Sequence, residues 1–444
     1  MSHTIEPRKL KGFRDYNPEQ ALMRKFITDQ VWQVAVAAGF QPIMTPALEY
    51  AETLVGSGGG DTDKEVYRFK DHGDREVALR FDLTVPFARF VAEHRGTLVF
   101  PFKKVQIGDV WRGEKPQKGR YREFCQADLD IVGVDSLAAD VEVLSCLSAV
   151  LGSFDKMTFD VALGHRVLLS KVISRFLPSA AASESTILTL IDKLTKIGED
   201  DVVSLIAKVP GASDAEARVL VRAITRRDAQ GETDLDALAE EVGGDEEFRA
   251  ELLRFRETRS VLQTLHRPNV KFRADLSIAR GLGYYTGIVF ETTIDQLPGF
   301  GSIASGGRYN RLLSRFTSQE LPGMGGSIGV DRFLAALEEV GQLALGTFPR
   351  DVYVAVATED SRAYAVAIAD DLRRTGVPCD LSIKPGKLGQ QFKNADRLGY
   401  RLVILVGTEE LQSQTFSIKI LASGEEIKGL RRSDLIQATR AALA

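Results

Sequence analysis

The order of apolar and polar residues predicts a helix near the start of the chain. Residues 19–40 carry apolar side chains at helical spacing, among them Leu22, Phe26 and Val34, and a glycine ends the run. The next stretch, QPIMTPALEY, has prolines at its edges, which is typical of the margin of a β-sheet. The chain is therefore expected to open with a helix that leads to a sheet edge.

Strand patterns occupy two regions, with a helical region between them. From about 65 to 133 the apolar runs are short and often alternating, as in VALRFDLTVPF and KKVQIGDVWR, which predicts antiparallel strands. Residues from about 166 to 262 have few aromatics and mix heptad-like apolar spacing with acidic stretches, which predicts a helical insertion. Strand-like, glycine-rich sequence returns from 271 to 340, and a domain boundary is expected near 346–350.

The remainder of the chain is expected to form a small α/β domain with a largely central parallel sheet. DVYVAVAT, VPCDLSI and RLVILVG have the composition of strands, and residues 361–374 have that of a helix. A second helix is predicted from four apolar residues at helical spacing: Leu388, Phe392, Ala395 and Leu398.

Side-chain parity identifies a candidate pocket on one predicted strand. Successive side chains of a strand point to opposite faces. One face would carry Phe124, Gln126, Asp128 and Asp130, and the other Cys125, Ala127, Leu129 and Ile131. The polar row would suit the floor of a pocket for a small polar ligand, while a half-solvated strand with its polar side outward is the alternative.

A cationic loop precedes this strand in WRGEKPQKGRYREF. Arg112 offers a planar fork that can clamp a phosphate, and Glu114 could accept a hydrogen bond from an exocyclic amine. Phe124 could stack on a purine. Further cations give the loop a positive field suited to phosphates: Lys115, Lys118, Arg120 and Arg122. On these residues alone, a nucleotide or nucleic-acid site and a solvated surface loop both remain open.

Composition narrows the class of protein. With 444 residues, 44% hydrophobic and 27% charged, the chain is long enough for several globular domains. The net charge of -4 argues against bulk coating of nucleic acid but allows a local basic site. Cys125, Cys146 and Cys379 lie far apart and the His residues lack HExxH spacing, so neither a disulfide framework nor a zinc site is indicated. The chain has no apolar run long enough to predict a membrane segment, and a cytoplasmic location is expected.

Several segments resemble, in order, the motifs of class II aminoacyl-tRNA synthetases in the form typical of histidyl-tRNA synthetases. GFQPIMTPALEY (39–50) fits motif 1, the stretch WRGEKPQKGRYREFCQADLDIVG (111–133) resembles motif 2, and GMGGSIGVDRF (323–333) is similar to motif 3. Pro46 would be the motif 1 proline, in a homodimer interface.

The other matching segments include two histidine-specific signatures. LRFDLTVPFARF (79–90) resembles the family's substrate strand, and ARGLGYYTGIVFE (279–291) and SGGRYNRLL (305–313) resemble its two histidine signatures. KLGQQFKNADRLGYRLVILVG (387–407) resembles the C-terminal anticodon-binding domain. The resemblance covers essentially the whole chain.

The resemblance implies an α+β fold, in which a class II antiparallel sheet with flanking helices carries a helical insertion and is followed by a C-terminal α/β anticodon-binding domain. The implied divisions are 1–165 and 263–345 for the two parts of the catalytic core, 166–262 for the insertion and 350–444 for the anticodon-binding domain. The implied reaction activates L-histidine with ATP, accompanied by Mg²⁺, and passes the histidyl group to the 3' end of tRNA(His). No metal site made by protein side chains alone is expected.

The same resemblance assigns roles to individual residues. Arg280 would bridge the histidine carboxylate and the α-phosphate as the catalytic arginine, together with Arg112. The implied histidine-binding residues are Asp82, Leu83, Thr84, Arg112, Gln126, Asp130, Arg280, Tyr284 and Tyr285. The implied ATP-binding residues are Arg112, Glu114, Arg120, Phe124 and Arg332. Arg332 starts a predicted helix, where a cation opposes the macrodipole, so it is either a ligand contact or the partner of Asp331.

Positions that depart from the family pattern keep a second hypothesis open. Gly283, Asn310 and Asp331 stand where aspartate, aspartate and glutamate are usual. Family paralogues such as the regulatory subunit of ATP phosphoribosyltransferase do not charge tRNA, but they usually lack the anticodon-binding domain and often lose arginines that clamp ATP. A nucleic-acid-binding protein without catalysis would leave the histidine pocket unexplained.

Overall fold

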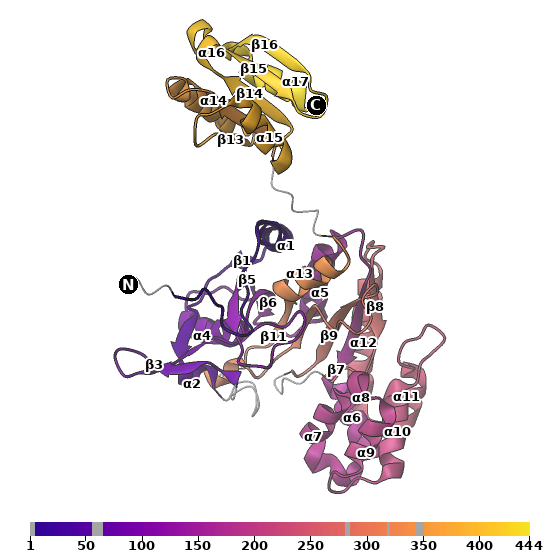
Figure 1. The fold of residues 1–444 in the computed structure, drawn as a ribbon. Helices are drawn as coiled ribbons and strands as arrows, with labels where there is room; N and C mark the ends of the chain where they lie inside the picture. Colours follow the sequence, from indigo (N-terminus) through magenta and orange to yellow (C-terminus); the bar gives the residue numbers. More distant parts are fainter. Residues whose placement is uncertain (1–4, 56–64, 280–284, 318–319, 343–349) are drawn as a thin grey trace. The chain divides into compact units, whose positions relative to one another are not determined.

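The structure, a computed structural model, describes residues 5–55, 65–279, 285–317, 320–342 and 350–444 (Figure 1). The chain forms two compact units, Met1–Gly346 and Thr347–Ala444. Each unit has its own apolar core. Within the described ranges, none of the helices combines the length and the apolar character that crossing a membrane requires.

An eight-stranded sheet organises the first unit. Its strands, in spatial order, are β1 (Gln41–Pro42), β5 (Phe102–Trp111), β6 (Glu123–Val132), β11 (Gly323–Gly329), β10 (Ala304–Arg308), β9 (Ile288–Ile294), β7 (Phe159–His165) and β8 (Val270–Ala274). Pairing is antiparallel from β5 to β7 and parallel only at the two ends, where β1 joins β5 and β8 joins β7. The expected antiparallel sheet is confirmed, and the proline-bordered stretch does form its margin.

Helices cover the apolar face of this sheet. They are α1 (Pro18–Ala37), α5 (Leu137–Gly152) and α13 (Val330–Glu339), which pack on one another and on β6 and β11 (Figure 1). At their junction Phe333 lies edge-on to Phe154 and Phe159, with ring centroids 4.7 and 5.9 Å away. Such edge-to-face pairs add to the area that the rings bury, so this cluster ties α13 to the sheet.

The N-terminal helix has a clear start and a single buried face. The Asn17 side chain accepts a hydrogen bond from Gln20 N, and the Gln20 side-chain oxygen accepts one from Asn17 N, which makes a capping box. The side chains that are fully buried recur every fourth residue: Met23, Ile27, Val31 and Ala35. Phe26 and Val34 lie at the flank of this face, so the helix was predicted correctly but its buried face is centred one residue later.

The expectation of a strand through VALRFDLTVPF is wrong after Leu79. Strand β4 (Glu76–Leu79) joins β2 (Leu48–Tyr50) and β3 (Arg68–Lys70) in a small sheet, and the chain then forms helix α4 (Thr84–His94). The apolar residues of that segment recur at helical spacing and are buried on one face: Val85, Ala88 and Val91. Apolar alternation over a few residues fits both periods, and packing of the helix against its neighbours decided between them.

The predicted helical insertion is present. Its helices are α6 (Arg166–Phe176), α7 (Glu184–Ile191), α8 (Leu194–Ile197), α9 (Glu199–Ile206), α10 (Asp214–Thr225), α11 (Leu235–Val242) and α12 (Glu246–Gln263). They connect β7 to β8, which pair in parallel and therefore need a long crossover. Helix α12 returns along α5 and β8, so the insertion is anchored on the core sheet.

The second unit has a five-stranded sheet in the order β13 (Cys379–Leu381), β12 (Val352–Val356), β14 (Leu402–Val406), β15 (Thr415–Ile420) and β16 (Glu426–Arg431). The first three strands are parallel, as predicted, and the last two continue antiparallel. The accompanying helices are α14 (Arg362–Arg374), α15 (Leu388–Leu398), α16 (Thr408–Ser413) and α17 (Leu435–Leu443).

Replacing Phe333 with alanine should destabilise the first unit by about 3–5 kcal/mol, because it removes a fully buried ring from an aromatic cluster. Urea unfolding, monitored by circular dichroism, measures the change in the free energy of unfolding. Phe69→Ala is the matched control, since that ring is 47% exposed. Equal losses for the two variants would contradict the assigned core.

Candidate active site

Both faces of strand β6 are buried from Ala127 onward. Cys125, Ala127, Leu129 and Ile131 lie in the main core, as the parity argument predicted. On the opposite face, Asp128 and Asp130 are each only 2% exposed. Because carboxylates are rarely buried without partners, this polar face is built for interactions, and the half-solvated alternative is wrong.

Two residues from outside β6 hold the Asp130 carboxylate in place. Lys104 on β5 lies directly opposite in the strand register, with its Nζ 2.8 Å from Asp130 Oδ2. Tyr309, just after β10, donates its hydroxyl to Asp130 Oδ1 at 2.5 Å. Lys104 is fully buried, and its ammonium also lies 4.9 Å from the centre of the Phe87 ring. The carboxylate therefore sits in a fixed, dry setting.

The glycines of β11 make room for this arrangement. Gly325 lies opposite Asp130 in the register, and a Cβ there would be 1.8 Å from Asp130 Oδ1. A Cβ on Gly323 would be 2.4 Å from the Tyr309 ring. A side chain at either position would collide with the buried cluster, so a close approach explains glycine at both positions.

Two further carboxylates face the same region. Asp82, between β4 and α4, accepts a hydrogen bond from Val85 N at 3.1 Å and lies in the field of Arg112 and Lys104. Burial raises the pKa of Asp82 to about 6. Burial likewise raises the pKa of Asp128, against the field of Lys104 and a hydrogen bond with Ser327. The site thus holds an excess of buried carboxylates over cations, which suits a cationic ligand.

Gln126 lies on the same face of β6, between Asp128 and the start of the strand. Its side-chain Nε2 donates to Ser327 Oγ on β11 at 3.0 Å. Nearby residues of the predicted histidine set differ in accessibility, since Leu83 is fully buried and Thr84 is half-buried. Leu83 is therefore enclosed by its neighbours, whereas Thr84 is partly open to a ligand.

The arginine at the end of β5 links the two halves of the site. Arg112 donates from Nε to the carbonyl of Phe81 at 2.9 Å, next to Asp82. Its guanidinium lies 5.1 Å from the centre of the Phe124 ring, at the start of β6. The planar guanidinium is thus fixed beside an aromatic face. The cationic loop begins directly after Arg112.

The cationic loop is partly tied down by carboxylates. Arg120 lies 3.6 Å from Glu114, and Lys118 pairs with Glu339 on α13 at 2.5 Å. Arg122 donates to the carbonyls of Glu114 and Lys11. These contacts are exposed or half-exposed and hence weak, so incoming phosphates can replace them.

Arg332 reaches the same loop from the first turn of α13. It donates to the carbonyl of Phe300, and its Cγ would be 3.4 Å from a Cβ on Gly119 at the loop tip. The neighbouring Asp331 is buried and accepts hydrogen bonds from Cys125 N and the Tyr16 hydroxyl, with Arg24 3.6 Å away. Asp331 therefore has partners of its own on β6 and the N-terminal segment.

Arg280 and Tyr284 lie outside the described residues, as does Gly283. Tyr285 is described, and its ring packs beside Gly307 on β10. Along one face of β6 the structure thus places Phe124, beside Arg112, at the start, Gln126 next and Asp130 near the end. Asp82 lies in the field of both Arg112 and Lys104. Among the described residues no group of His, Cys, Asp or Glu side chains has the arrangement of a metal site.

Sequence reasoning overlooked Lys104, Tyr309 and Ser327. Tyr309 lies inside the SGGRYNRLL segment, so that segment was its only sequence signal. Lys104 lies in a strand with alternating pattern, where a charged residue ordinarily faces solvent, and nothing local distinguishes it. Its role appears only in the pairing of β5 with β6.

Comparisons with known proteins agree with this geometry. The family model for histidyl-tRNA synthetase matches residues 12–333, and that for an anticodon binding domain matches residues 351–441. Histidine–tRNA ligases of Rhodopirellula baltica and Wolinella succinogenes are 41% and 39% identical, each match covering 95% of both chains. The crystal structure of histidyl-tRNA synthetase from Nostoc sp. PCC 7120 has a TM-score of 0.85 at 28% identity and covers 99% of this chain and 100% of the other.

The fold and the relatives it shares define an aminoacyl-tRNA ligase. Within that class, the chain belongs to the histidyl-tRNA synthetase family.

Replacing Asp82 with asparagine should stabilise the fold above pH 7. Because its folded pKa is raised to about 6, ionisation of Asp82 costs stability as the pH rises through that value. The gain should reach about 3 kcal/mol at pH 8 and fall to about half at pH 5. Urea titrations at both pH values measure it, with the exposed Asp155→Asn as control. A gain that is independent of pH would contradict the assigned cause.

Proposed function

We propose that the chain is a histidine–tRNA ligase, which activates L-histidine with ATP to histidyl-adenylate and transfers the histidyl group to the 3' end of tRNA(His). The observation that carries the proposal is the row of side chains along one face of β6. The polar row of β6 begins at Phe124, beside Arg112, and continues to the buried Asp130. One surface thus offers cations and an aromatic face for a nucleotide next to carboxylates for a cationic amino acid.

Histidine is proposed to bind along the carboxylate end of the row. Asp82 and Thr84 hold its α-amino group, with the backbone of Leu83 between them. Asp130, with Gln126 at the side, receives the imidazole, and Tyr309 and Lys104 hold the Asp130 carboxylate in place. Tyr284 and Tyr285 complete the wall. A hydrogen-bonding site of this kind rejects apolar analogues, because they would leave its buried groups unpaired.

ATP is proposed to bind at the arginine end. Arg112 contacts the α-phosphate, Phe124 and Arg332 lie on the two faces of adenine, and Glu114 accepts from its exocyclic amine. Arg120, freed from Glu114, meets the phosphates. The Arg112 guanidinium is already held by the Phe81 carbonyl, so little reorganisation is needed.

Arg280, with Arg112, is proposed to be the catalytic arginine. Activation brings a histidine carboxylate against a polyanion, and fixed guanidinium groups neutralise the like charges as the carboxylate oxygen attacks the α-phosphorus. Mg²⁺ is proposed to arrive with ATP. It takes its ligands mainly from phosphates and water, a common mode for this ion.

The other parts of the chain are proposed to serve tRNA. Residues 350–444 bind the anticodon stem, residues 166–262 lie over the acceptor arm, and 1–165 with 263–345 form the catalytic core. The KPQKGRYR loop meets the acceptor end. A cytoplasmic location is proposed with these roles.

A homodimer is proposed through the motif 1 segment. Its side chains alternate between buried and exposed, and those left exposed are largely apolar: Met44, Pro46, Leu48 and Tyr50. Exposed apolar side chains that follow one another along a segment suit an interface. The alternative of a regulatory paralogue is less well supported, because residues 351–441 match an anticodon binding domain and Arg112, Arg280 and Arg332 are all retained.

Histidine-dependent exchange of pyrophosphate into ATP, followed by charging of tRNA(His), tests the proposal. Wild-type protein should support both reactions. Arg280→Ala should lower exchange by at least about 100-fold without loss of folding, since one charge-stabilising donor is commonly worth that much. Arg374→Ala, an exposed arginine on α14, should leave exchange unchanged. A well-folded protein without exchange would overturn the ligase, and exchange without charging would favour the paralogue.

Tyr309→Phe should raise the KM for histidine about tenfold or more while leaving the KM for ATP within about twofold. The variant removes only the hydroxyl that donates to Asp130 and keeps the ring that packs over Gly323. Exchange kinetics with each substrate varied separately measure the effect. An unchanged KM for histidine would place Asp130 outside the histidine pocket.

A further inference from the structure

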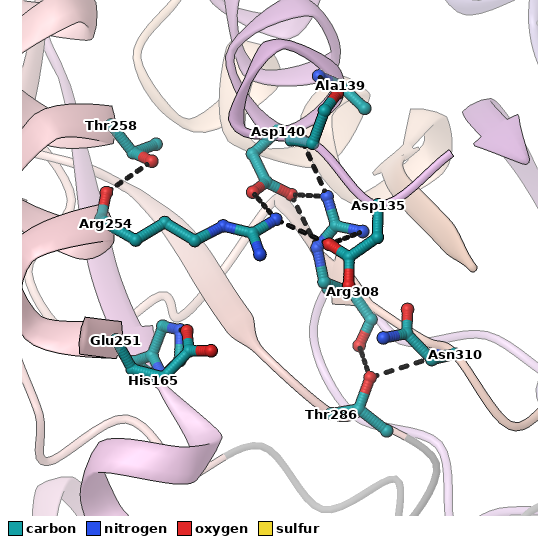
Figure 2. Close-up of polar contacts among 11 residues, drawn as sticks. Asp135, Ala139, Asp140, His165, Glu251, Arg254, Thr258, Thr286, Arg308 and Asn310 are labelled. Carbon is teal, nitrogen blue, oxygen red and sulfur yellow. Dashed lines mark hydrogen bonds and ion pairs between the residues drawn. The ribbon is translucent and has the colours of Figure 1, made fainter. Parts of the chain in front are cut away.

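An ion-pair network joins the helical insertion to the catalytic sheet (Figure 2). It is buried at Arg308 and Asp140 and partly exposed at Arg254 and Asp135. At its centre is Arg308, the last residue of β10, which is 3% exposed. Its Nη2 lies 2.6 Å from Asp140 Oδ1 on α5 and donates to the carbonyl of Ser136 at 2.9 Å. Its Nη1 lies 3.1 Å from Asp135.

Helix α12 of the insertion contributes the second arginine. Arg254 reaches the same carboxylates, with its Nη2 2.7 Å from Asp135 Oδ1 and 3.4 Å from Asp140 Oδ2. One turn earlier Glu251 lies 3.4 Å from His165, at the end of β7. The two core aspartates are thus shared between an arginine of the core and an arginine of the insertion.

The core arginine also holds the middle of the first histidine signature. The carbonyl of Arg308 accepts a hydrogen bond from Thr286 N at 2.8 Å, and the Thr286 hydroxyl accepts one from Asn310 N at 3.0 Å. The Arg308 side chain crosses over Gly287, where a Cβ would be 2.9 Å from its Cδ. Next in sequence stands Tyr309, whose hydroxyl contacts Asp130.

Such a network is better suited to fixing geometry than to adding stability. A buried ion pair gains little over an apolar pair of the same shape, because both charges lose their hydration. Burial of Asp140 accordingly raises its pKa in spite of Arg308. The directional forks of two arginines on shared carboxylates do, however, define how α12, α5 and β10 meet.

We propose that Arg254 is a positioning residue for the amino-acid site. Through its ion pairs, the way in which the insertion packs on the core fixes the position of Arg308, Thr286 and Tyr309. The inference rests on the proposed function, because it concerns the binding of histidine. It makes activation of the amino acid depend on the element proposed to lie over the tRNA acceptor arm.

Arg254→Ala tests this coupling in the full-length protein by pyrophosphate exchange. The KM for histidine should rise about five- to tenfold, while the KM for ATP stays within about twofold. The matched control is Arg256→Ala on the same helix, whose partner Asp236 is an exposed residue of the insertion itself. That variant should leave both KM values unchanged. An unchanged KM for histidine in Arg254→Ala, or equal changes for both substrates, would overturn the proposal.

Asp135→Asn provides the same test from the core side, and it keeps the proposal testable if Arg254→Ala folds poorly. Asp135 is 44% exposed, and both arginines keep Asp140 as a partner, so neutralising Asp135 leaves no buried charge unpaired. The double variant, Arg254→Ala with Asp135→Asn, should raise the KM for histidine no further than either single variant, because both substitutions act on one network. Additive effects would overturn the proposal. Absence of exchange in the wild type would instead refute the proposed function.

Discussion

The buried pair of Lys104 and Asp130 is the interaction on which the rest of the site depends. An ammonium and a carboxylate without solvent are tolerated only when each finds its counter-charge, so β5 and β6 must stay in the register that places them opposite each other. A slip of one residue would turn Asp130 into the apolar core. The same carboxylate then needs Tyr309 as donor and Gly325 as open space. The register of β5 and β6, the hydrogen bond from Tyr309 and the glycines of β11 are thus all needed to accommodate the Asp130 carboxylate.

An antiparallel sheet suits this arrangement because it brings distant segments side by side. Strands β6 and β11 are neighbours although nearly two hundred residues separate them along the chain, and the histidine-signature strands β9 and β10 follow directly. The pocket floor therefore receives side chains from both parts of the catalytic core. The insertion between those parts leaves the sheet at β7 and returns at β8, whose parallel pairing requires such a crossover. Its attachment to the sheet is consequently close to the signature strands.

Much of the architecture could be predicted from local patterns. Parity along β6 separated Cys125, Ala127, Leu129 and Ile131 from the polar row correctly, because alternation is a property of the strand itself. The helix at residues 19–40 and the helices of the insertion were also predicted. The segment after Leu79 was not, because a short apolar run is compatible with both a strand and a helix until its neighbours are known. Lys104 was missed for a related reason, since its partners come from other strands.

By itself the sequence determined most of the elements and, through its motifs, the family. These follow from local periodicity and from residue order, which need no neighbours in space. Only the tertiary structure decided that the polar face of β6 is buried, that Lys104 and Tyr309 hold Asp130, and that Arg254 and Arg308 share two aspartates. Burial and charge pairing depend on which distant segments come into contact, and that is settled when the sheet and the insertion pack together.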